Sequence, residues 1–216
     1  MAKKTKEDID DLPETKDEET EEETEEETEN PRGKKRMPGF LRTIFEFAVA
    51  LVIALALTWG LKTFVIEPFE VPTGSMETTI NIGDKLLAEK ITLNFSPVQR
   101  GDIVVFADKV QPGRVLVKRV IAVGGQVVDL RNGVVYVDGL PLYEPYTHGS
   151  LSYPLDQHFD NMQITYPYTV PEGYLWVMGD NRENSADSRY FGCIDENSVY
   201  GRAILVFWPL QDIGPL

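Results

Sequence analysis

The sequence contains very little cysteine and histidine. Its 216 residues include one cysteine, Cys193, and two histidines, His148 and His158. A single cysteine excludes a disulfide within the chain, and two histidines are too few for most zinc sites. We therefore expect no metal and no cofactor, and a function that depends on ordinary side chains.

Positive charge is also scarce, and its distribution is uneven. The chain has 21 Lys+Arg against 35 Asp+Glu, a formal net charge of -14. Residues 1–30 contribute -11, residues 31–65 contribute +5, and residues 66–216 contribute -8. Because nucleic-acid binding needs a broad basic surface to meet the phosphates, this distribution excludes nucleic acid as a partner. It also shows that the chain is not one uniform globular body.

The first 30 residues have almost no apolar side chains and are close to a repeat of Glu-Glu-Glu-Thr. Such a composition offers nothing to offset the entropy lost on ordering the chain. A basic cluster follows at residues 32–36. We expect residues 1–39 to form a disordered acidic and then basic tail. A solvated tail is the simpler interpretation, and an acidic docking site is the alternative.

A long apolar run follows the basic cluster. It covers residues 40–61, and none of residues 47–61 is charged. At 1.5 Å per residue, this length spans a hydrocarbon core of about 30 Å. Arg42 and Glu46 lie four residues apart near its start, where they can pair and reach the interface. The run predicts a transmembrane signal-anchor helix over residues 40–62.

The flanks of the run indicate how it is used. A cleaved signal peptide would need a small-residue cleavage site after the run, but the chain continues Trp-Gly-Leu-Lys. A buried helix of a soluble protein is the other alternative. Because basic residues precede the run and only Lys62 closely follows it, we expect a cytoplasmic N-terminus. The remainder of the chain would then face outward from the plasma membrane.

Beyond the apolar run, short β-branched segments alternate with Gly, Pro and Asp turns. The segments lie at residues 64–71, 85–93, 102–106, 115–123, 127–130, 134–139, 174–180 and 203–210. Asn132-Gly133 and Asp138-Gly139 are typical of two-residue hairpin turns. We predict a mainly β, antiparallel domain over residues 63–216, in one or two packed sheets, with a looser insertion at residues 143–170.

Ser75 is the first candidate for chemistry. It lies in the segment Val-Pro-Thr-Gly-Ser-Met, residues 71–76, directly after a predicted strand. Pro-Thr-Gly favours a tight turn that exposes the following hydroxyl and N–H. A serine after glycine is most often an ordinary turn residue, and a nucleophilic serine needs a base. Neither histidine lies in a suitable sequence setting.

Lys118 could supply that base. It lies within the apolar strand of residues 115–123, where alternation places it on one face with Val120 and Ala122. Loss of hydration disfavours an ammonium and lowers the pKa of lysine from about 10.4, so the amine can become neutral near pH 7 and accept a proton. A lysine extending from an edge strand into solvent is the alternative.

The segment from Gly179 to Gly192 concentrates charged and amide side chains with two serines. Asp187 and Arg189 are two residues apart, so they can pair along one face of an extended segment. Ser185 has the same parity and could hydrogen-bond a nearby amine. A solvent-exposed loop is the alternative for this segment taken alone.

Together these segments resemble the bacterial type I signal peptidases, membrane-anchored serine peptidases with a Ser/Lys dyad. The resemblance covers residues 69–208 and the anchor, with four sequence boxes in order at 72–76, 100–106, 117–121 and 179–192. One departure is visible: Thr78 stands where the family often has proline, whereas Ile80 keeps the apolar position. Related endoplasmic-reticulum enzymes have histidine in place of Lys118, so the lysine indicates the bacterial type.

The resemblance implies a role for each matching residue. Ser75 would be the nucleophile and Lys118 the general base, with Ser185 orienting the amine. The Thr73 hydroxyl and the Ser75 N–H would form the oxyanion hole. Two ion pairs would position the last box: Asp187 with Arg189, and Arg119 with Asp180.

The resemblance also implies the substrate: the signal peptide of a secretory preprotein, bound as an extended strand with small side chains at the first and third positions before the cut. Shallow apolar pockets beside the serine would exclude larger groups. They would be formed by Phe69, Val71, Pro72, Met76 and Val117. Main-chain pairing would add affinity with little demand on sequence.

Two other functions share part of this pattern. A catalytically inactive, membrane-tethered β domain that binds secreted partners would keep the fold, but it could lose the Ser/Lys pair, which is present here. A self-cleaving repressor would share the Ser/Lys chemistry. It would also need a DNA-binding N-terminal domain, which the acidic tail and the anchor exclude.

Overall fold

The computed structural model describes residues 38–216, except for the side chains of residues 61–64. The tail predicted over residues 1–39 lies outside the described residues apart from its last two, and so does the basic cluster. The described part of the chain consists of one long helix and a β domain.

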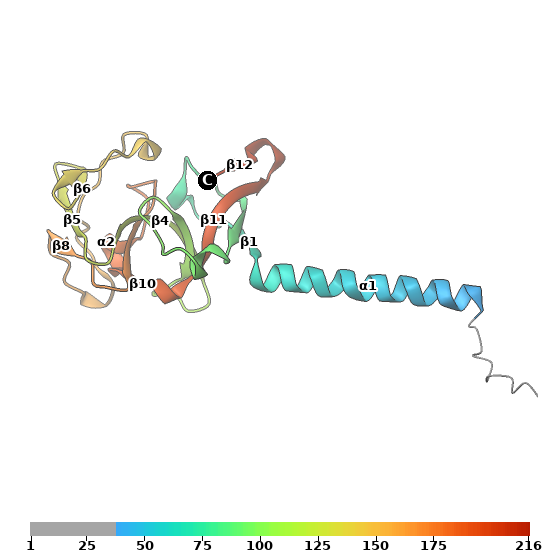
Figure 1. Cartoon of the computed structure of the whole chain (residues 1–216). Coiled ribbons are helices and arrows are strands. Elements are labelled where there is room, and N and C mark those ends of the chain that lie inside the picture. Colours follow the sequence, from blue (N-terminus) through green and yellow to red (C-terminus); the bar gives the residue numbers. More distant parts are fainter. Residues whose placement is uncertain (1–37) are drawn as a thin grey trace, which may run out of the picture. The chain divides into compact units, whose positions relative to one another are not determined.

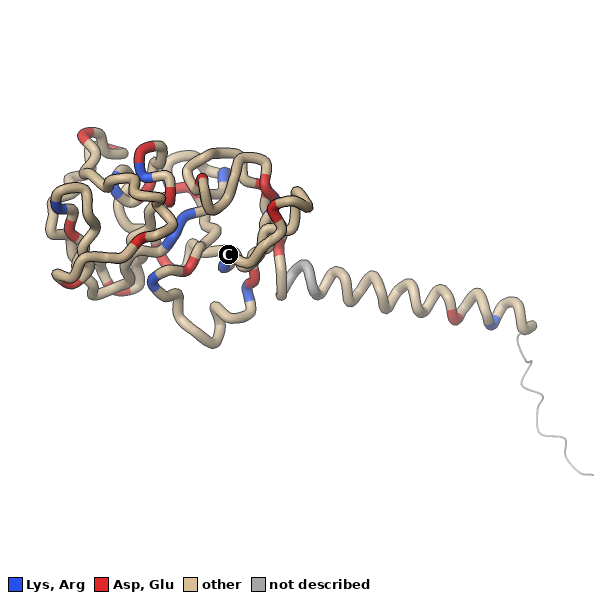
Figure 2. Tube along the Cα trace, turned by 90° about the horizontal axis from the view of Figure 1, so that it is seen from above, with Lys and Arg blue, Asp and Glu red and all other residues tan. Residues whose placement is uncertain are grey.

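Helix α1 runs from Gly39–Phe64 and includes the predicted span. Its residues 39–60 are long and apolar enough to cross a membrane by length and composition. No charged residue occurs between Glu46 and Gly60, which Figure 2 shows as an uninterrupted tan stretch of the tube. The hydroxyls of Thr43 and Thr58 donate to the carbonyls four residues earlier, which satisfies these polar groups within the helix.

The β domain contains two antiparallel sheets (Figure 1). The larger has eight strands in the order β1-β2-β11-β3-β4-β9-β10, with β12 paired to β11. Its strands are β1 Ile66–Glu70, β2 Lys85–Glu89, β3 Ile103–Ala107, β4 Val115–Val123, β9 Tyr174–Met178, β10 Ile194–Asp195, β11 Val199–Trp208 and β12 Gly214–Pro215. The smaller has the order β7-β6-β5-β8, with β5 Val127–Arg131, β6 Val134–Val137, β7 Leu140–Pro141 and β8 Tyr168–Thr169.

Two of the predicted turns connect the strands of the small sheet. Asn132 and Gly133 join β5 to β6 and both have positive φ, as a two-residue hairpin turn of this kind requires. Asp138 and Gly139 join β6 to β7 in the same way. The prediction of a mainly β, antiparallel domain is confirmed.

The two sheets share part of the hydrophobic core. One buried cluster combines Ile121 and Trp176 of the large sheet with Val128 and Val135 of the small one. A second cluster packs the beginning of the domain, including Val71 and Met76, against β2, β3, β4 and β11. Burial of these side chains stabilises the domain by the ordinary hydrophobic effect and fixes the strands that carry the candidate residues.

Candidate active site

Ser75 lies in a single 3-10 turn, Gly74–Met76, between β1 and β2. Two contacts hold the turn in place. The side chains of Met76 and Ile80 are buried, and Ile80 N donates to the Met76 carbonyl at 2.8 Å. Thr78, the position that departs from the family pattern, is exposed. The apolar anchor of the turn is therefore retained at Ile80, while the substituted position faces solvent.

Lys118 lies in the middle of β4, directly opposite Val104 of β3 in the register of the sheet. Its side chain is only 2% exposed, and its Nζ donates a hydrogen bond to the Oγ of Ser75. The structure thus brings together two residues that are 43 positions apart in the chain. A strand in the centre of a sheet holds such a group more precisely than a loop would.

The environment of Lys118 favours its neutral form. Burial lowers the pKa of its amine from an ordinary value of 10.5 to about 8. Asp187 opposes the shift, and Arg114 adds to it. A substantial fraction of the amine is consequently unprotonated slightly above neutral pH, and its lone pair can then accept the proton of the Ser75 hydroxyl.

Thr73 and Ser185 are the two further hydroxyl residues expected at the dyad. The Oγ1 of Thr73 is 3.5 Å from the Oγ of Ser75. Ser185 Oγ is buried, and no hydrogen bond joins it to the Lys118 amine, although Ser185 contributes to lowering the pKa of the nearby Asp187. The expected hydrogen bond from Ser185 to the lysine amine is therefore absent from this structure, although Ser185 lies beside Gly179, against which the Ser75 carbonyl also packs.

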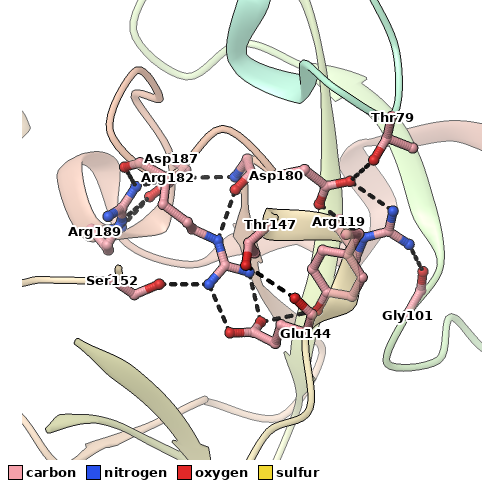
Figure 3. A network of polar contacts seen from close by, with 12 residues as sticks. Thr79, Gly101, Arg119, Glu144, Thr147, Ser152, Asp180, Arg182, Asp187 and Arg189 are labelled. Atoms are coloured by element: carbon pink, nitrogen blue, oxygen red, sulfur yellow. Dashed lines mark hydrogen bonds and ion pairs between the residues drawn. The ribbon is translucent and has the colours of Figure 1, made fainter. Parts of the chain in front are cut away.

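Both expected ion pairs are present (Figure 3). Arg189 contacts Asp187 through two nitrogens, each 2.9 Å from a carboxylate oxygen. Arg119 contacts Asp180 at 2.9 and 2.7 Å. Burial alone would raise the pKa of Asp187, but the charge and hydrogen bonds of Arg189, together with the Gly179 N–H and Ser185, hold that pKa below its ordinary value. Two bidentate pairs thus fix the backbone on both sides of Ser185.

Asn181 is a site residue to which no local sequence pattern assigns a specific role. Its backbone N donates to the Ser75 carbonyl at 3.1 Å, and its side-chain amide donates to the Gly74 carbonyl at 3.0 Å. Both bonds hold the peptide groups that flank the nucleophile. Its position inside the segment Gly179–Gly192 was the available signal, but the partner carbonyls lie more than 100 residues earlier.

The residues expected to form apolar pockets have different positions. Val71, Met76 and Val117 are buried in one core cluster, Phe69 packs partly buried against it, and Pro72 is exposed. A cavity of about 410 Å³ adjoins the dyad on another side. Besides Thr73, Ser75 and Lys118, it is lined by Asp108, Val110, Gln111, Arg114, Leu116, Asn184, Ala186, Tyr190 and Phe191.

Some of these cavity residues could have been found from the sequence. Leu116 shares a face of β4 with Lys118 by simple alternation. Arg114 and Asp108 lie on the connection between β3 and β4, which carries no motif that would point to the site.

Comparisons with known proteins identify the family of this chain. The model of the family described as signal peptidase, peptidase S26, matches residues 44–208. A probable signal peptidase I-1 from Synechocystis sp. is 40% identical over 187 residues, which covers 83% of this chain and 90% of the relative. A signal peptidase I from Leptolyngbya laminosa is 37% identical, covering 78% of this chain and 80% of the relative.

Two further matches come from other bacteria. A signal peptidase I from Bacillus amyloliquefaciens is 33% identical over 184 residues, covering 85% of this chain and 95% of the relative. A solved structure of a signal peptidase I from Enterococcus faecalis is 34% identical with a TM-score of 0.40, covering 50% of this chain and 97% of that one.

Proposed function

The chain belongs to the signal peptidase family, peptidase S26, and we propose that Ser75 and Lys118 are the dyad with which it cleaves signal peptides from preproteins. It is a serine endopeptidase of the signal peptidase I type, with a helix suited to membrane anchoring. The observation that carries the assignment is the hydrogen bond from the buried Lys118 amine to the Ser75 hydroxyl.

The first half of the reaction follows from this contact. Neutral Lys118 takes the proton from Ser75 Oγ, which attacks the carbonyl carbon of the scissile bond. The negative charge that develops on the carbonyl oxygen is stabilised by the Ser75 N–H and the Thr73 hydroxyl. The protonated lysine then gives its proton to the amine of the mature protein, the C–N bond breaks, and the signal peptide remains as an ester on Ser75.

In the second half of the reaction, Lys118 acts as the base on a water molecule instead of on Ser75. Lys118 is neutral again after the first product has left, so it removes a proton from a water molecule that attacks the ester carbonyl. Return of that proton to Ser75 Oγ breaks the ester and releases the signal peptide. The same base thus serves both steps, and neither step needs an additional group.

The substrate is proposed to bind as an extended strand that carries small residues at the first and third positions before the cut. The small pockets would lie against the apolar cluster that contains Phe69, Val71, Met76 and Val117, two members of which, Val71 and Met76, are close to Ser75 in the chain. We propose that the N-terminus is cytoplasmic and the β domain extracytoplasmic.

The dyad is tested by cleavage of a preprotein with an Ala-x-Ala site by the full chain in detergent. Ser75→Ala and Lys118→Ala should each reduce the rate by at least about 10³-fold, because neither half of the dyad works alone. Ser198→Ala and Lys90→Ala, at half-buried positions outside the site, are matched controls and should cleave normally. Cleavage that survives Ser75→Ala would contradict the assignment.

A further inference from the structure

A buried ion pair connects the insertion between β7 and β8 to the segment that carries Ser185. Arg182 is 2% exposed, and its Nη2 and Nη1 lie 2.6 and 2.9 Å from the two carboxylate oxygens of Glu144. Its Nη1 also donates to Ser152 Oγ at 2.6 Å (Figure 3). Two parallel bonds to one carboxylate restrain both the position and the orientation of the guanidinium.

Tyr146 completes this contact. Its hydroxyl donates to Glu144 Oε1 at 2.9 Å, and its ring centre lies 4.0 Å from the guanidinium carbon of Arg119 and 5.9 Å from that of Arg182. Burial and the neighbouring Glu144 raise the pKa of Tyr146, so the phenol stays protonated and remains a donor. One aromatic ring therefore supports two arginines.

Both arginines act directly on the surroundings of the dyad. Arg182 Nε donates to the Gly179 carbonyl at 2.9 Å, and Gly179 packs against the Ser75 carbonyl. Arg119 follows Lys118 on β4 and holds Asp180, which also accepts a hydrogen bond from Thr79 at 2.5 Å. A displacement of Arg182 would therefore reach Ser75 through Gly179, and a displacement of Arg119 would reach the adjacent Lys118 directly.

The charges of this network balance. Three buried or nearly buried arginines, Arg119, Arg182 and Arg189, face three carboxylates, Glu144, Asp180 and Asp187. Removal of one carboxylate leaves a buried cation without its partner, which drives the guanidinium towards water and opens the packing around it. Glu144 is the member that comes from the insertion rather than from the segments that carry the dyad.

We propose that Glu144 and Tyr146 are positioning residues, through which the insertion holds Arg182 and Arg119 and thereby the geometry of the Ser75–Lys118 dyad. The inference rests on the proposed peptidase function. The chain that follows β7 of the small sheet therefore helps to position the segment of residues 179–192 at the active site.

The test compares Glu144→Gln with the unchanged full chain in preprotein cleavage. The loss of charge should lower kcat by about 10-fold or more and leave KM within about threefold, because geometry changes while the binding surface does not. A looser segment also lets water reach Lys118, so the apparent pKa of the pH–rate profile should rise above 8. The charged groups that bear on Lys118 itself, Asp187, Arg114, Asp108 and Asp180, are unchanged in this variant.

Tyr146→Phe is a second, milder variant. It removes the hydrogen bond to Glu144 but keeps the ring under the arginines, so it should show a smaller fall in kcat in the same direction. Glu144→Asp keeps the charge and should retain more activity than Glu144→Gln. A general loss of folded protein could produce the same order of rates but would leave the pH profile unchanged, so the rise of the apparent pKa is the result that distinguishes a positioning role.

The small sheet offers a matched control. Asp129 accepts from Arg131 Nε at 2.6 Å, and Arg131 lies 5.0 Å from the ring centre of Tyr136, but none of the contacts described for this trio reaches residues 179–189. Asp129→Asn should lower the melting temperature of the domain without changing kcat or the pH profile, and Tyr136→Phe, which keeps the ring beside Arg131, should leave all three unchanged.

Two results separate the inference from the proposed function. If Glu144→Gln changes kcat and the apparent pKa no more than Asp129→Asn does, while Ser75→Ala is inactive, the dyad stands and the positioning role is wrong. If Ser75→Ala remains active, the proposed function itself is wrong.

Discussion

Burial of Lys118 favours catalysis but opposes the stability of the folded state. Its position in the centre of β4 keeps the amine beside Ser75, and burial there lowers its pKa to about 8. The same burial makes the protonated form unfavourable in the folded state. Function at this residue is therefore expected to reduce stability, as is common where a site needs an ionisable group in an apolar setting.

This conflict predicts the effect of Lys118→Met on stability. Below pH 8 both the folded and the unfolded states carry the ammonium, and the difference from 10.5 corresponds to a penalty of about 3 kcal/mol in the folded state. The penalty disappears as the pH rises from 8 to 10.5, because the unfolded state then holds the additional proton. A methionine at position 118 removes this penalty. It also removes the hydrogen bond to Ser75, and that loss costs about 1 kcal/mol of stability.

Lys118→Met should consequently be inactive, yet more stable at pH 7 by about 2 kcal/mol. Calorimetry of the full chain in detergent measures this difference. The stability of the unchanged chain should approach that of the variant as the pH rises towards 10.5. A variant that melts lower than the unchanged chain at pH 7 would show that burial of the ammonium is not the dominant effect.

At the scale of elements, the segment after β9 is shaped by Gly179. A Cβ at this position would overlap the Ser75 carbonyl oxygen and the Ser185 hydroxyl. Asp187 also accepts from Gly179 N at 3.1 Å, so the backbone here is held from both sides. The segment can lie this close to the nucleophile turn only because residue 179 has no side chain.

Gly179→Ala should therefore displace the segment from the nucleophile turn and lower kcat by about 10²-fold, as a shift of about 1 Å at an active site can do. Gly214→Ala is the matched control, because a Cβ there meets its nearest atom at an ordinary distance of 3.9 Å. Initial rates of preprotein cleavage measure both variants. Equal rates for the two would mean that the close packing at Gly179 is not needed.

The elements differ in how far the sequence determines them. The run of residues 115–123 predicts both ends of β4 correctly, because its nine residues are mostly β-branched or apolar and contain no glycine or proline. The start of β11 at Val199 was missed, since Tyr200, Gly201 and Arg202 interrupt the apolar pattern. The two-residue strands β7, β8, β10 and β12 are too short to produce any periodicity, and only their partners define them.

The residues of the candidate site also differ in whether local sequence can predict them. Ser75, Lys118 and the Asp187–Arg189 pair can be found from local sequence, because each lies in a short segment with an unusual composition. Glu144, Tyr146 and Asn181 could not be given a role, since their partners lie about 25 to more than 100 residues away and only the folded sheets bring them together. Contacts of this kind depend on topology rather than on any local pattern.

At the scale of the whole molecule, charge and hydropathy divide the sequence into parts with different tasks. The acidic tail, the basic flank and the apolar helix precede a β domain with a net charge of -8. A membrane anchor confines the enzyme to the same surface as the apolar segment of its substrate, which raises their effective concentration. In the proposed orientation, the basic flank decides on which side the domain lies.

The proposed orientation is tested by labelling single cysteines in intact bacterial cells, in a Cys193→Ala background. Leu140, 71% exposed on the small sheet, becomes cysteine in one variant, and Thr20 of the tail in the other. A membrane-impermeant maleimide should label Leu140→Cys in intact cells and Thr20→Cys only after lysis. The opposite pattern would reverse the orientation.

The dependence of the cleavage rate on pH tests the central claim, a buried and neutral Lys118 acting as base, most directly. For the unchanged enzyme, kcat/KM should rise about tenfold per pH unit below the lysine pKa and level off above about 8, since only the neutral amine accepts the proton. A rate that is flat from pH 6 to 10, or that keeps rising to about 10.5, would contradict it.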